Sequence, residues 1–305
     1  MTAKLLLTGA EGQLGSTIRQ HWASSSLADT YQLECCDLAD LDITDEAATR
    51  KYLERINPAL VINAAAYTAV DRAEQDSELA HAVNAKAAGY IANWCAERNA
   101  KMVQISTDFV FSGEASVPYN TEDLPAPLSE YGASKRAGEE QVQQNLPNSG
   151  VIVRTSWLYS EFGNNFVKTM LRLMTEKTEL GIVADQIGSP TSTHSLVKVI
   201  FQLLETDGVG IFHWSDGAAI SWYDFATEIQ AIGLELGILN KAIPLNKLTT
   251  AEYPTPATRP AYSVMDISNT LSLLSKTPRT WQEELRDVIA ALVNDYKDES
   301  RKIRI

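Results

Sequence analysis

Short apolar runs alternate with amphipathic stretches through the first half of this 305-residue chain. The runs are almost wholly apolar, as in strands buried on both faces of a parallel sheet, and the stretches between them have helical spacing. Strands are expected at residues 4–8, 31–36, 60–63, 102–106 and 151–154, and helices at 45–56 (with Thr44 as N-cap), 78–98 and 131–145. The alternation predicts an α/β fold with a doubly wound parallel sheet.

After Trp157 the alternation stops. Helices are expected at 166–176, 195–205, 221–236 and 280–296, one short strand at 180–183, and irregular chain at 185–193 and 253–260, where Gly and Pro occur. We therefore divide the chain at residue 156. Residues 1–156 carry the sheet, and residues 157–305 form mainly a smaller C-terminal lobe over its open edge, with some segments returning to the sheet.

Composition and charge exclude several classes of protein. The chain is 45% hydrophobic and 21% charged, which is typical of a globular protein, and its net charge is -13 without any Lys/Arg run. This charge disfavours a nucleic-acid partner. No apolar run has the length of a membrane span, and the N-terminus enters a strand without a signal peptide, so we expect a cytoplasmic protein.

The cysteines and histidines suggest no metal centre. Cys35, Cys36 and Cys95 lack Cys-x-x-Cys spacing, and the four histidines lie far apart in the sequence. The sequence therefore predicts neither a disulfide framework nor a bound metal.

A glycine-rich turn follows the first strand. Gly9, Gly12 and Gly15 recur at every third position where the strand gives way to a helix, which lets a pyrophosphate approach the backbone N–H groups. Asp37 ends the second strand about 20 residues later, where a carboxylate can hold the ribose hydroxyls of a dinucleotide. Since it also repels a 2′-phosphate and no Arg adjoins it, NADH is slightly favoured over NADPH. Glycines needed only for packing and a surface Asp remain the alternatives.

Tyr131 and Lys135 lie four residues apart in a predicted helix and so share one face. Bringing a phenol from pKa 10 to neutrality requires about 4 kcal/mol. A cation about 4 Å away supplies roughly that energy at an effective dielectric of about 20. Thr107 and Asp108, at the carboxyl end of the fourth strand, would face the same cleft. A solvated Tyr and Lys pair is the alternative.

Two other features stay open at this point. Ala64, Ala65 and Ala66 follow the third strand, either as a flat wall for a ring or as close packing. Asn84 lies inside a predicted helix and either faces the cleft or is exposed.

These motifs together resemble the extended, Rossmann-type short-chain dehydrogenase/reductases and, within them, the dTDP-4-dehydrorhamnose reductase family. The resemblance covers residues 4–292 and rests on Thr8 to Gly15, Asn63 to Asp71, Ser106 to Phe111, Tyr131 with Lys135, Arg154 to Tyr159, Gly163 to Val167, Asp185 to Thr191 and Pro254 to Pro260. It implies NADH- or NADPH-dependent reduction of dTDP-4-dehydro-6-deoxy-L-mannose to dTDP-L-rhamnose, with a dTDP-sugar as partner and no membrane.

The resemblance also implies roles for single residues. Thr107 would bind the C4 carbonyl, Tyr131 would donate the proton, and Lys135 would hold the nicotinamide ribose. Gly9, Gly12, Gln13 and Leu14 would lie under the pyrophosphate, Asp37 at the adenosine ribose, Asp42 and Ile43 near the adenine, and Ala64, Ala65 and Ala66 along the dinucleotide. Asp108 and Trp157 would face the sugar, with Asn165, Gln186 and Arg259 on the sugar-nucleotide side. A cationic fork such as Arg259 suits a pyrophosphate that enters an acidic protein.

Departures from the family pattern bear on assembly and on reaction type. Some members bind magnesium at a dimer interface through glutamates, at places that correspond here to Thr17 and His194, so no metal is predicted and both monomer and homodimer stay open. Related dehydratases carry an acid where this chain has Phe109, which favours reduction over dehydration or epimerisation. Two further alternatives are a reductase that sets another C4 configuration and a non-catalytic regulatory subunit like that of methionine adenosyltransferase.

Overall fold

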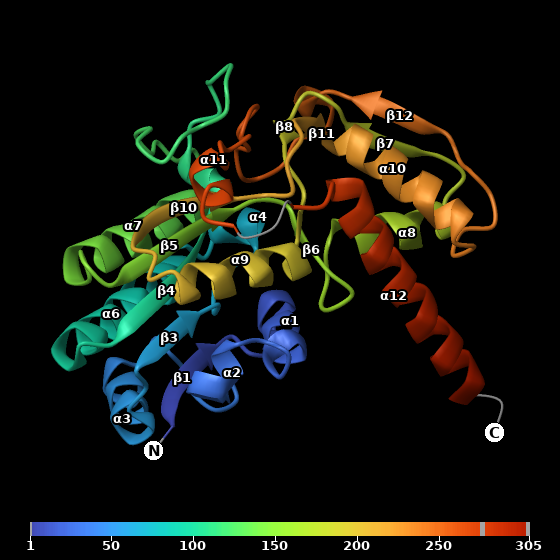
Figure 1. Cartoon of the computed structure of the whole chain (residues 1–305). Helices are drawn as coiled ribbons and strands as arrows, with labels where there is room; N and C mark the ends of the chain where they lie inside the picture. Colours follow the sequence, from blue (N-terminus) through green and yellow to red (C-terminus); the bar gives the residue numbers. More distant parts are fainter. Residues whose placement is uncertain (1, 275–277, 303–305) are drawn as a thin grey trace.

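The computed structural model describes residues 2–274 and 278–302. Within them, the centre is a six-stranded parallel sheet (Figure 1). Its strands are β1 (Ala3–Thr8), β2 (Tyr31–Cys36), β3 (Leu60–Asn63), β4 (Lys101–Thr107), β5 (Gly150–Thr155) and β10 (Gly210–Trp214), in the order β10-β5-β4-β3-β1-β2. The chain winds outward in both directions from β1 and β3, so ligands are expected at the carboxyl ends of these two strands.

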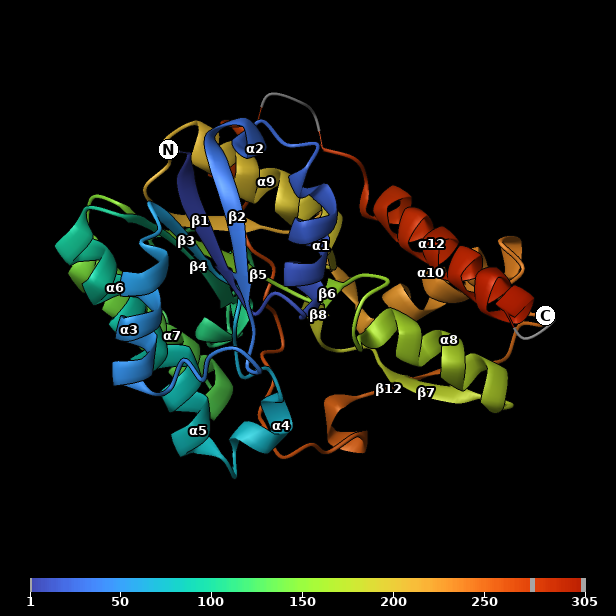
Figure 2. The same cartoon turned by 90° about the horizontal axis from the view of Figure 1, so that it is seen from below.

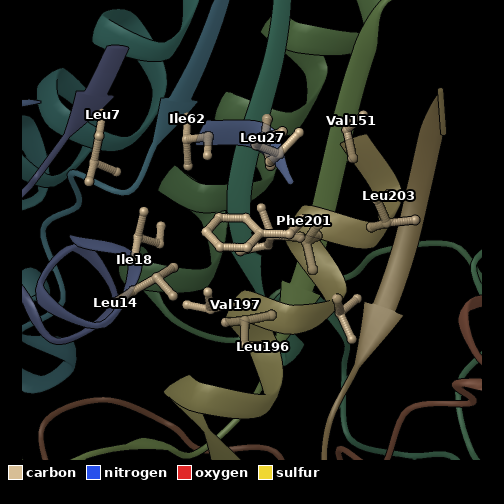
Figure 3. Packing of buried hydrophobic residues seen from close by; sticks show 14 of the residues in the cluster. Leu7, Leu14, Ile18, Leu27, Ile62, Val151, Leu196, Val197, Phe201 and Leu203 are labelled. Atoms are coloured by element: carbon tan, nitrogen blue, oxygen red, sulfur yellow. The ribbon is translucent and has the colours of Figure 1, made fainter. Parts of the chain in front are cut away.

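Helices cover both faces of the sheet (Figure 2). On one face, α1 (Gln13–Trp22) and α9 (Thr193–Glu205) enclose an apolar core in which Ile18, Leu196 and Phe201 pack near Leu7 and Val151 (Figure 3). On the other face, α3 (Glu46–Ile56), α6 (Ala87–Arg98) and α7 (Glu130–Asn145) form a second core. Burial on both faces explains the apolar runs of β1 and β3, whereas the edge strand β2 is partly exposed and carries Gln32 and Glu34.

The smaller lobe has a core of its own, in which Val167, Phe225, Ile229 and Leu285 are buried. Its helices are α8 (Phe166–Glu176), α10 (Trp222–Glu235) and α12 (Trp281–Lys302), beside the strand pair β7 (Leu180–Val183) and β12 (Leu245–Leu248). Two further short pairs are β6 (Leu158–Tyr159) with β9 (Thr191–Ser192) and β8 (Ile187–Gly188) with β11 (Ile220–Ser221).

Short elements connect these layers. They are α2 (Leu27–Thr30), α4 (Val70–Ala73), α5 (Ser77–His81), α11 (Ser268–Leu271), a π-helical turn at Ala82–Lys86 and 3₁₀ turns at Asp108–Val110 and Thr250–Glu252. Among the described helices, none is both long and apolar enough to cross a bilayer.

The predicted α/β class and its parallel sheet are confirmed, with differences in detail. The long helix at 78–98 is divided by the π-helical turn. Thr44 is not the N-cap of α3, because the Asp45 carboxylate accepts the bond from Ala48 N at 2.9 Å while the Thr44 hydroxyl donates to Asp42. The boundary at residue 156 stays a prediction, and β10 and α9, from beyond that boundary, lie with the sheet.

Candidate active site

The glycine turn, residues 9–15, leaves the carboxyl end of β1 and opens α1. Gly9 has a φ of 66°, and a Cβ atom there would lie 2.6 Å from the backbone nitrogen of Ala65. A Cβ at Gly15 would lie 2.1 Å from the carbonyl oxygen of Gly9. No side chain caps the start of α1 at Gly12. The turn therefore leads into a helix N-terminus whose first N–H groups have no side-chain cap, as a phosphate requires, although the N–H groups of Ala10, Glu11 and Gly12 are bonded within the protein.

Gln13, at the start of α1, binds the smaller lobe. Its Oε1 accepts bonds from Asn165 Nδ2 at 2.9 Å and from the Ser160 hydroxyl at 3.2 Å, and its Nε2 donates to the carbonyl of Asn164. Asn165 also caps α8 through Lys168 N. The structure thus places Asn165 beside the glycine turn, with its side-chain amide engaged by the protein. Leu14 is buried in the core under the turn.

Asp37 lies against the glycine turn, where its Oδ2 accepts a bond from Glu11 N at 2.8 Å. Asp42 stands in a turn of its own and accepts bonds from the backbone N–H and hydroxyl of Thr44. Ile43 is buried in the second core. The three residues predicted for the adenosine side therefore follow β2 closely, with Asp37 nearest to the glycines.

Ala64, Ala65 and Ala66 are half-buried and pack closely, and their place along a ring stays a prediction. Ala64 N donates to the carbonyl of Thr8, and the backbone of Ala65 lies against Gly9. Small side chains permit this close packing and also leave the backbone accessible.

β4 and α7 bring Thr107 and Tyr131 together. The Tyr131 phenol faces the Thr107 hydroxyl, whose interaction lowers the pKa of the phenol against the effect of burial, and this hydroxyl donates to Asp108 Oδ1 at 3.0 Å. Ser129 caps α7 through Gly132 N, so Tyr131 lies in the first turn of the helix. The predicted cluster of hydroxyls at the carboxyl end of β4 is therefore present.

Lys135 lies one turn farther along α7 and is buried, with its Nζ donating to the carbonyl of Ile105 at 2.6 Å. Burial lowers the pKa of Lys135 to about 8, against an opposing effect of Glu139. Burial also raises the pKa of Tyr131 to about 12. The spacing predicted an acidic phenol, and the structure shows the reverse, because removal from water disfavours the charged form of both groups.

Asp108 is also buried. Burial raises its pKa to about 6, although Ser263 and Thr107 donate hydrogen bonds to it. A carboxyl group beside the phenol thus titrates near neutrality.

The smaller lobe contributes the opposite wall of the cleft. A small cavity of about 20 Å³ is lined by Phe109, Trp157, Gln186, Ile187, Trp222, Arg259, Pro260 and Ser263. Trp157 has a φ of 45° and lies against Gly188, where a Cβ would be 2.6 Å from its indole. Its ring stacks on Trp222 with centroids 3.6 Å apart. Trp157, Gln186 and Arg259, all predicted on the sugar-nucleotide side, therefore meet in one place.

Arg259 is held by a carboxylate from the first half of the chain. Its Nη1 and Nη2 donate to the two oxygens of Asp71, at 3.0 and 2.8 Å. The hydrogen bond from Arg259 lowers the pKa of Asp71. Asp71 comes from α4, so this pair joins the two halves of the chain beside the cavity.

Sequence reasoning missed some residues of the site and left another undecided. Trp222 and Ser263 carry no local signal, because their place in the cavity depends on contacts with distant segments. Asn84 is buried rather than exposed, and it bonds Tyr67 and the Ser134 hydroxyl of α7. It therefore supports the helix that carries Tyr131.

The two positions linked to magnesium in the family resemblance have other contacts here. Thr17 bonds Thr193 through their hydroxyls at 2.7 Å, and His194 lies between His21 and Glu161. In the part of the chain that the structure describes, no group of His, Cys, Asp and Glu is placed to hold a metal.

Nearly the whole chain is similar in sequence to known proteins of one family. A family model described as the RmlD substrate binding domain matches residues 3–294. A dTDP-4-dehydrorhamnose reductase of Aggregatibacter actinomycetemcomitans is 38% identical over 94% of this chain and 99% of its own.

Solved structures show the same similarity. A dTDP-4-dehydrorhamnose reductase of Clostridium acetobutylicum superposes with a TM-score of 0.88 at 40% identity, covering 95% of this chain and 99% of its own. The enzyme of the same name from Bacillus anthracis, solved in complex with NADP, gives a TM-score of 0.87 at 37% identity, covering 95% and 100%.

Proposed function

Because the chain belongs to the dTDP-4-dehydrorhamnose reductase family, we propose that it reduces the C4 ketone of dTDP-4-dehydro-6-deoxy-L-mannose to dTDP-L-rhamnose with NADH or NADPH. It is an oxidoreductase of dTDP-rhamnose biosynthesis. The observation that carries the proposal is the Thr107 and Tyr131 hydroxyl pair, with Lys135 one turn away, at the sheet edge that also bears the glycine turn.

The residues present fit a nicotinamide dinucleotide. Gly9 and Gly15 leave no room for a Cβ, and the uncapped start of α1 suits a pyrophosphate. We assign Gly9, Gly12, Gln13 and Leu14 to the pyrophosphate, Asp37 to the adenosine ribose, Asp42 and Ile43 to the adenine, Ala64, Ala65 and Ala66 to the length of the cofactor, and Tyr131 and Lys135 to the nicotinamide ribose. The bound cofactor supplies the hydride from its nicotinamide C4.

Thr107 and Tyr131 act on the ketone oxygen. Hydrogen bonds from both hydroxyls polarise the carbonyl and favour charge on oxygen in the transition state. As the C4 atom of the sugar gains the hydride, the ketone oxygen takes the proton of the Tyr131 hydroxyl. An alkoxide is a far stronger base than a phenolate, so a phenol whose pKa is about 12 still donates. The Lys135 ammonium stabilises the phenolate until a proton returns from solvent.

The sugar nucleotide lies between the triad and the smaller lobe in this proposal. Asp108 and Trp157 face the sugar, and Arg259 meets the pyrophosphate with N–H groups of its guanidinium that Asp71 does not engage. Gln186 and Asn165 complete the sugar-nucleotide side. Asn165 reaches the ligand only if its bond to Gln13 is exchanged for one to the ligand.

The proposal is tested by product analysis. The protein is incubated with enzymatically generated dTDP-4-keto-6-deoxy sugars and either NADH or NADPH, and the product is identified by NMR. We expect dTDP-L-rhamnose. A product epimeric at C4 would identify a different reductase, and absence of turnover with both cofactors would favour a non-catalytic role.

The cytoplasmic location and the choice between monomer and homodimer stay predictions. Cell fractionation checks the first, and light scattering on the purified chain checks the second.

A further inference from the structure

A buried carboxylate, Glu139, lies on α7 one turn beyond Lys135 and has no part in the reaction as proposed. Its Oε1 accepts bonds from the Ser106 hydroxyl at 2.6 Å and from Arg154 Nε at 2.8 Å. Its Oε2 accepts bonds from Arg154 Nη2 at 2.7 Å and Arg136 Nη1 at 3.1 Å. Burial alone would raise the pKa of Glu139, but the bonds from Arg154, Ser106 and Arg136 hold it below its ordinary value. The group is therefore ionised at neutral pH.

Its contact on β4 connects Glu139 to the active site. Ser106 stands between Ile105, whose carbonyl accepts the bond from Lys135, and Thr107, which faces Tyr131. Three consecutive residues of β4 thus contact three residues of α7 that lie one helical turn apart. The pairs are Ile105 with Lys135, Ser106 with Glu139 and Thr107 with Tyr131. The contacts cover nine residues of α7, from Tyr131 to Glu139, or about 12 Å of helix axis.

Glycines bring α7 close to its neighbours, and the bond from Asn84 to the Ser134 hydroxyl adds a first directional contact. A Cβ at Gly132 would lie 2.2 Å from the Phe109 carbonyl oxygen, and one at Gly138 would lie 2.1 Å from that of Asn84. Glycine contacts are non-directional, whereas the hydrogen bonds of Glu139 have defined directions. Glu139 therefore fixes the angle at which α7 presents Tyr131 and Lys135 to β4.

The charges around Lys135 give Glu139 a second effect on the same site. On α7, Glu139 opposes the loss of the Lys135 proton that burial promotes. From β5, the Arg154 guanidinium is paired with Glu139. From β10, His213 is buried, and burial with the nearby Arg154 lowers its pKa to about 4, so it is neutral. Asp108 lies beside Tyr131, where its charge raises the pKa of the phenol.

We propose that Glu139 is a positioning residue of the reductase. Its carboxylate holds α7 against β4 and keeps the Lys135 ammonium charged while Lys135 is out of contact with water. This inference rests on the proposed function, because it assigns Glu139 to the support of that triad.

The test compares two substitutions at this position. Glu139→Gln keeps the shape and removes the charge, whereas Glu139→Asp keeps the charge and shortens the reach. Glu140→Gln, an exposed change at the next residue of α7, is the matched control. Each variant is measured for turnover of the 4-keto sugar nucleotide from pH 6 to pH 9.5 at saturating NADH, after thermal unfolding has shown that it is folded.

We expect Glu139→Gln to move the alkaline limb of the profile down by about one pH unit, with a loss of about tenfold at pH 9 and less than twofold at pH 6. Glu139→Asp should lower turnover evenly with its limb unmoved, and Glu140→Gln should match the wild type. An even loss at all pH values for Glu139→Gln would show a purely structural role and overturn the proposal. If that variant does not fold, Glu139→Gln with Arg154→Gln removes the unpaired cation as well, and it should move the limb in the same direction by a smaller amount, because one negative and one positive charge are lost together.

A second measurement is independent of activity. In protein labelled with ¹³C-lysine, the Cε signal of Lys135, assigned with Lys135→Arg, is titrated in wild type and Glu139→Gln. A midpoint about one unit lower in the variant supports the inference even if no 4-keto sugar is turned over. Coincident midpoints exclude it even if the reductase activity is confirmed.

Discussion

At the residue scale, burial disfavours the charged forms of both Tyr131 and Lys135, and its effect on Tyr131 suits reduction. A phenol whose pKa is about 12 is fully protonated before the hydride arrives, so each turnover begins with the proton in place. A lysine whose pKa is about 8 is still mostly charged at neutrality. The two pKa values together define the pH range in which Tyr131 is protonated and Lys135 is charged.

The first prediction concerns the proton donor. Tyr131→Phe should lower turnover of the 4-keto sugar nucleotide by roughly 100-fold or more, because the ketone oxygen loses its proposed proton donor, while NADH affinity stays nearly the same. Steady-state kinetics and NADH fluorescence titration provide the measurements. Turnover like that of the wild type would exclude Tyr131 as the donor.

The second prediction concerns pH. Protonated Lys135 predominates below its pKa of about 8, so wild-type kcat/KM should be level below about pH 7 and fall about tenfold per unit above pH 8. The measurement is a pH profile with saturating cofactor. A profile that stays level to pH 10 would contradict a need for the charged amine.

The third prediction concerns cofactor choice. Asp37 lies against the glycine turn with its Oδ2 bonded to Glu11 N, where a 2′-phosphate would meet its charge. Asp37→Ala should therefore raise the ratio of kcat/KM for NADPH to that for NADH about tenfold, in line with removal of one unfavourable charge contact of about 1.4 kcal/mol. An unchanged ratio would remove Asp37 from the ribose site.

At the element scale, the position of α7 depends on glycines as much as on apolar packing. Gly132 and Gly138 let the helix approach the backbone of two neighbouring segments. The capping hydroxyl of Ser129 then sets where the first turn begins. A reactive side chain in the first turn of a helix is thus placed by features at several points along that helix.

The fourth prediction compares two glycines at the interface between α6 and α7. Gly138→Ala puts a Cβ against the Asn84 carbonyl and should cost about 1–3 kcal/mol of stability, which lowers Tm by several degrees. Gly89→Ala meets only the mobile end of Gln141 and should be neutral or slightly stabilising, since Ala favours helix. Equal melting temperatures for the two variants would contradict this account of the packing.

The elements that could be predicted from sequence are those with local signals. The strands that end at Thr8 and Asn63, the glycine turn, and the shared face of Tyr131 and Lys135 follow from periodicity and turn chemistry. The strand β10 could not be predicted in this way. Its five residues place a short apolar run among glycines and polar residues, which is also typical of a loop. The Asp71 and Arg259 pair is beyond local reasoning, because 188 positions separate its partners.

At the scale of the whole molecule, the two halves of the chain share one cleft, and the Asp71 and Arg259 pair spans it. The Asp71 side chain is 42% exposed, so the pair contributes little to stability, on the order of 1 kcal/mol or less. Its bidentate geometry nevertheless fixes the direction of the guanidinium beside the cavity. Under the proposed function, its main effect would be to orient this cation for the substrate.

The fifth prediction follows from this orientation. Asp71→Asn should raise the KM for the sugar nucleotide several-fold and leave kcat and Tm nearly unchanged, because Arg259 loses its fixed direction but keeps its charge. Arg72→Gln, which breaks an exposed ion pair with Asp76 on the same segment, is the control. A lower kcat at constant KM in Asp71→Asn would place the pair in the chemical step instead.

The return of β10 to the edge of the sheet has a consequence for biosynthesis. Thr107, Tyr131 and Lys135 leave the ribosome well before Gly210, yet until β10 pairs with β5 that strand has an open edge, and until α9 forms one face of the sheet lacks its cover. The nascent chain therefore carries the three proposed catalytic groups long before it has a site, and a fragment that stops at residue 156 would be prone to aggregate rather than to turn over substrate slowly.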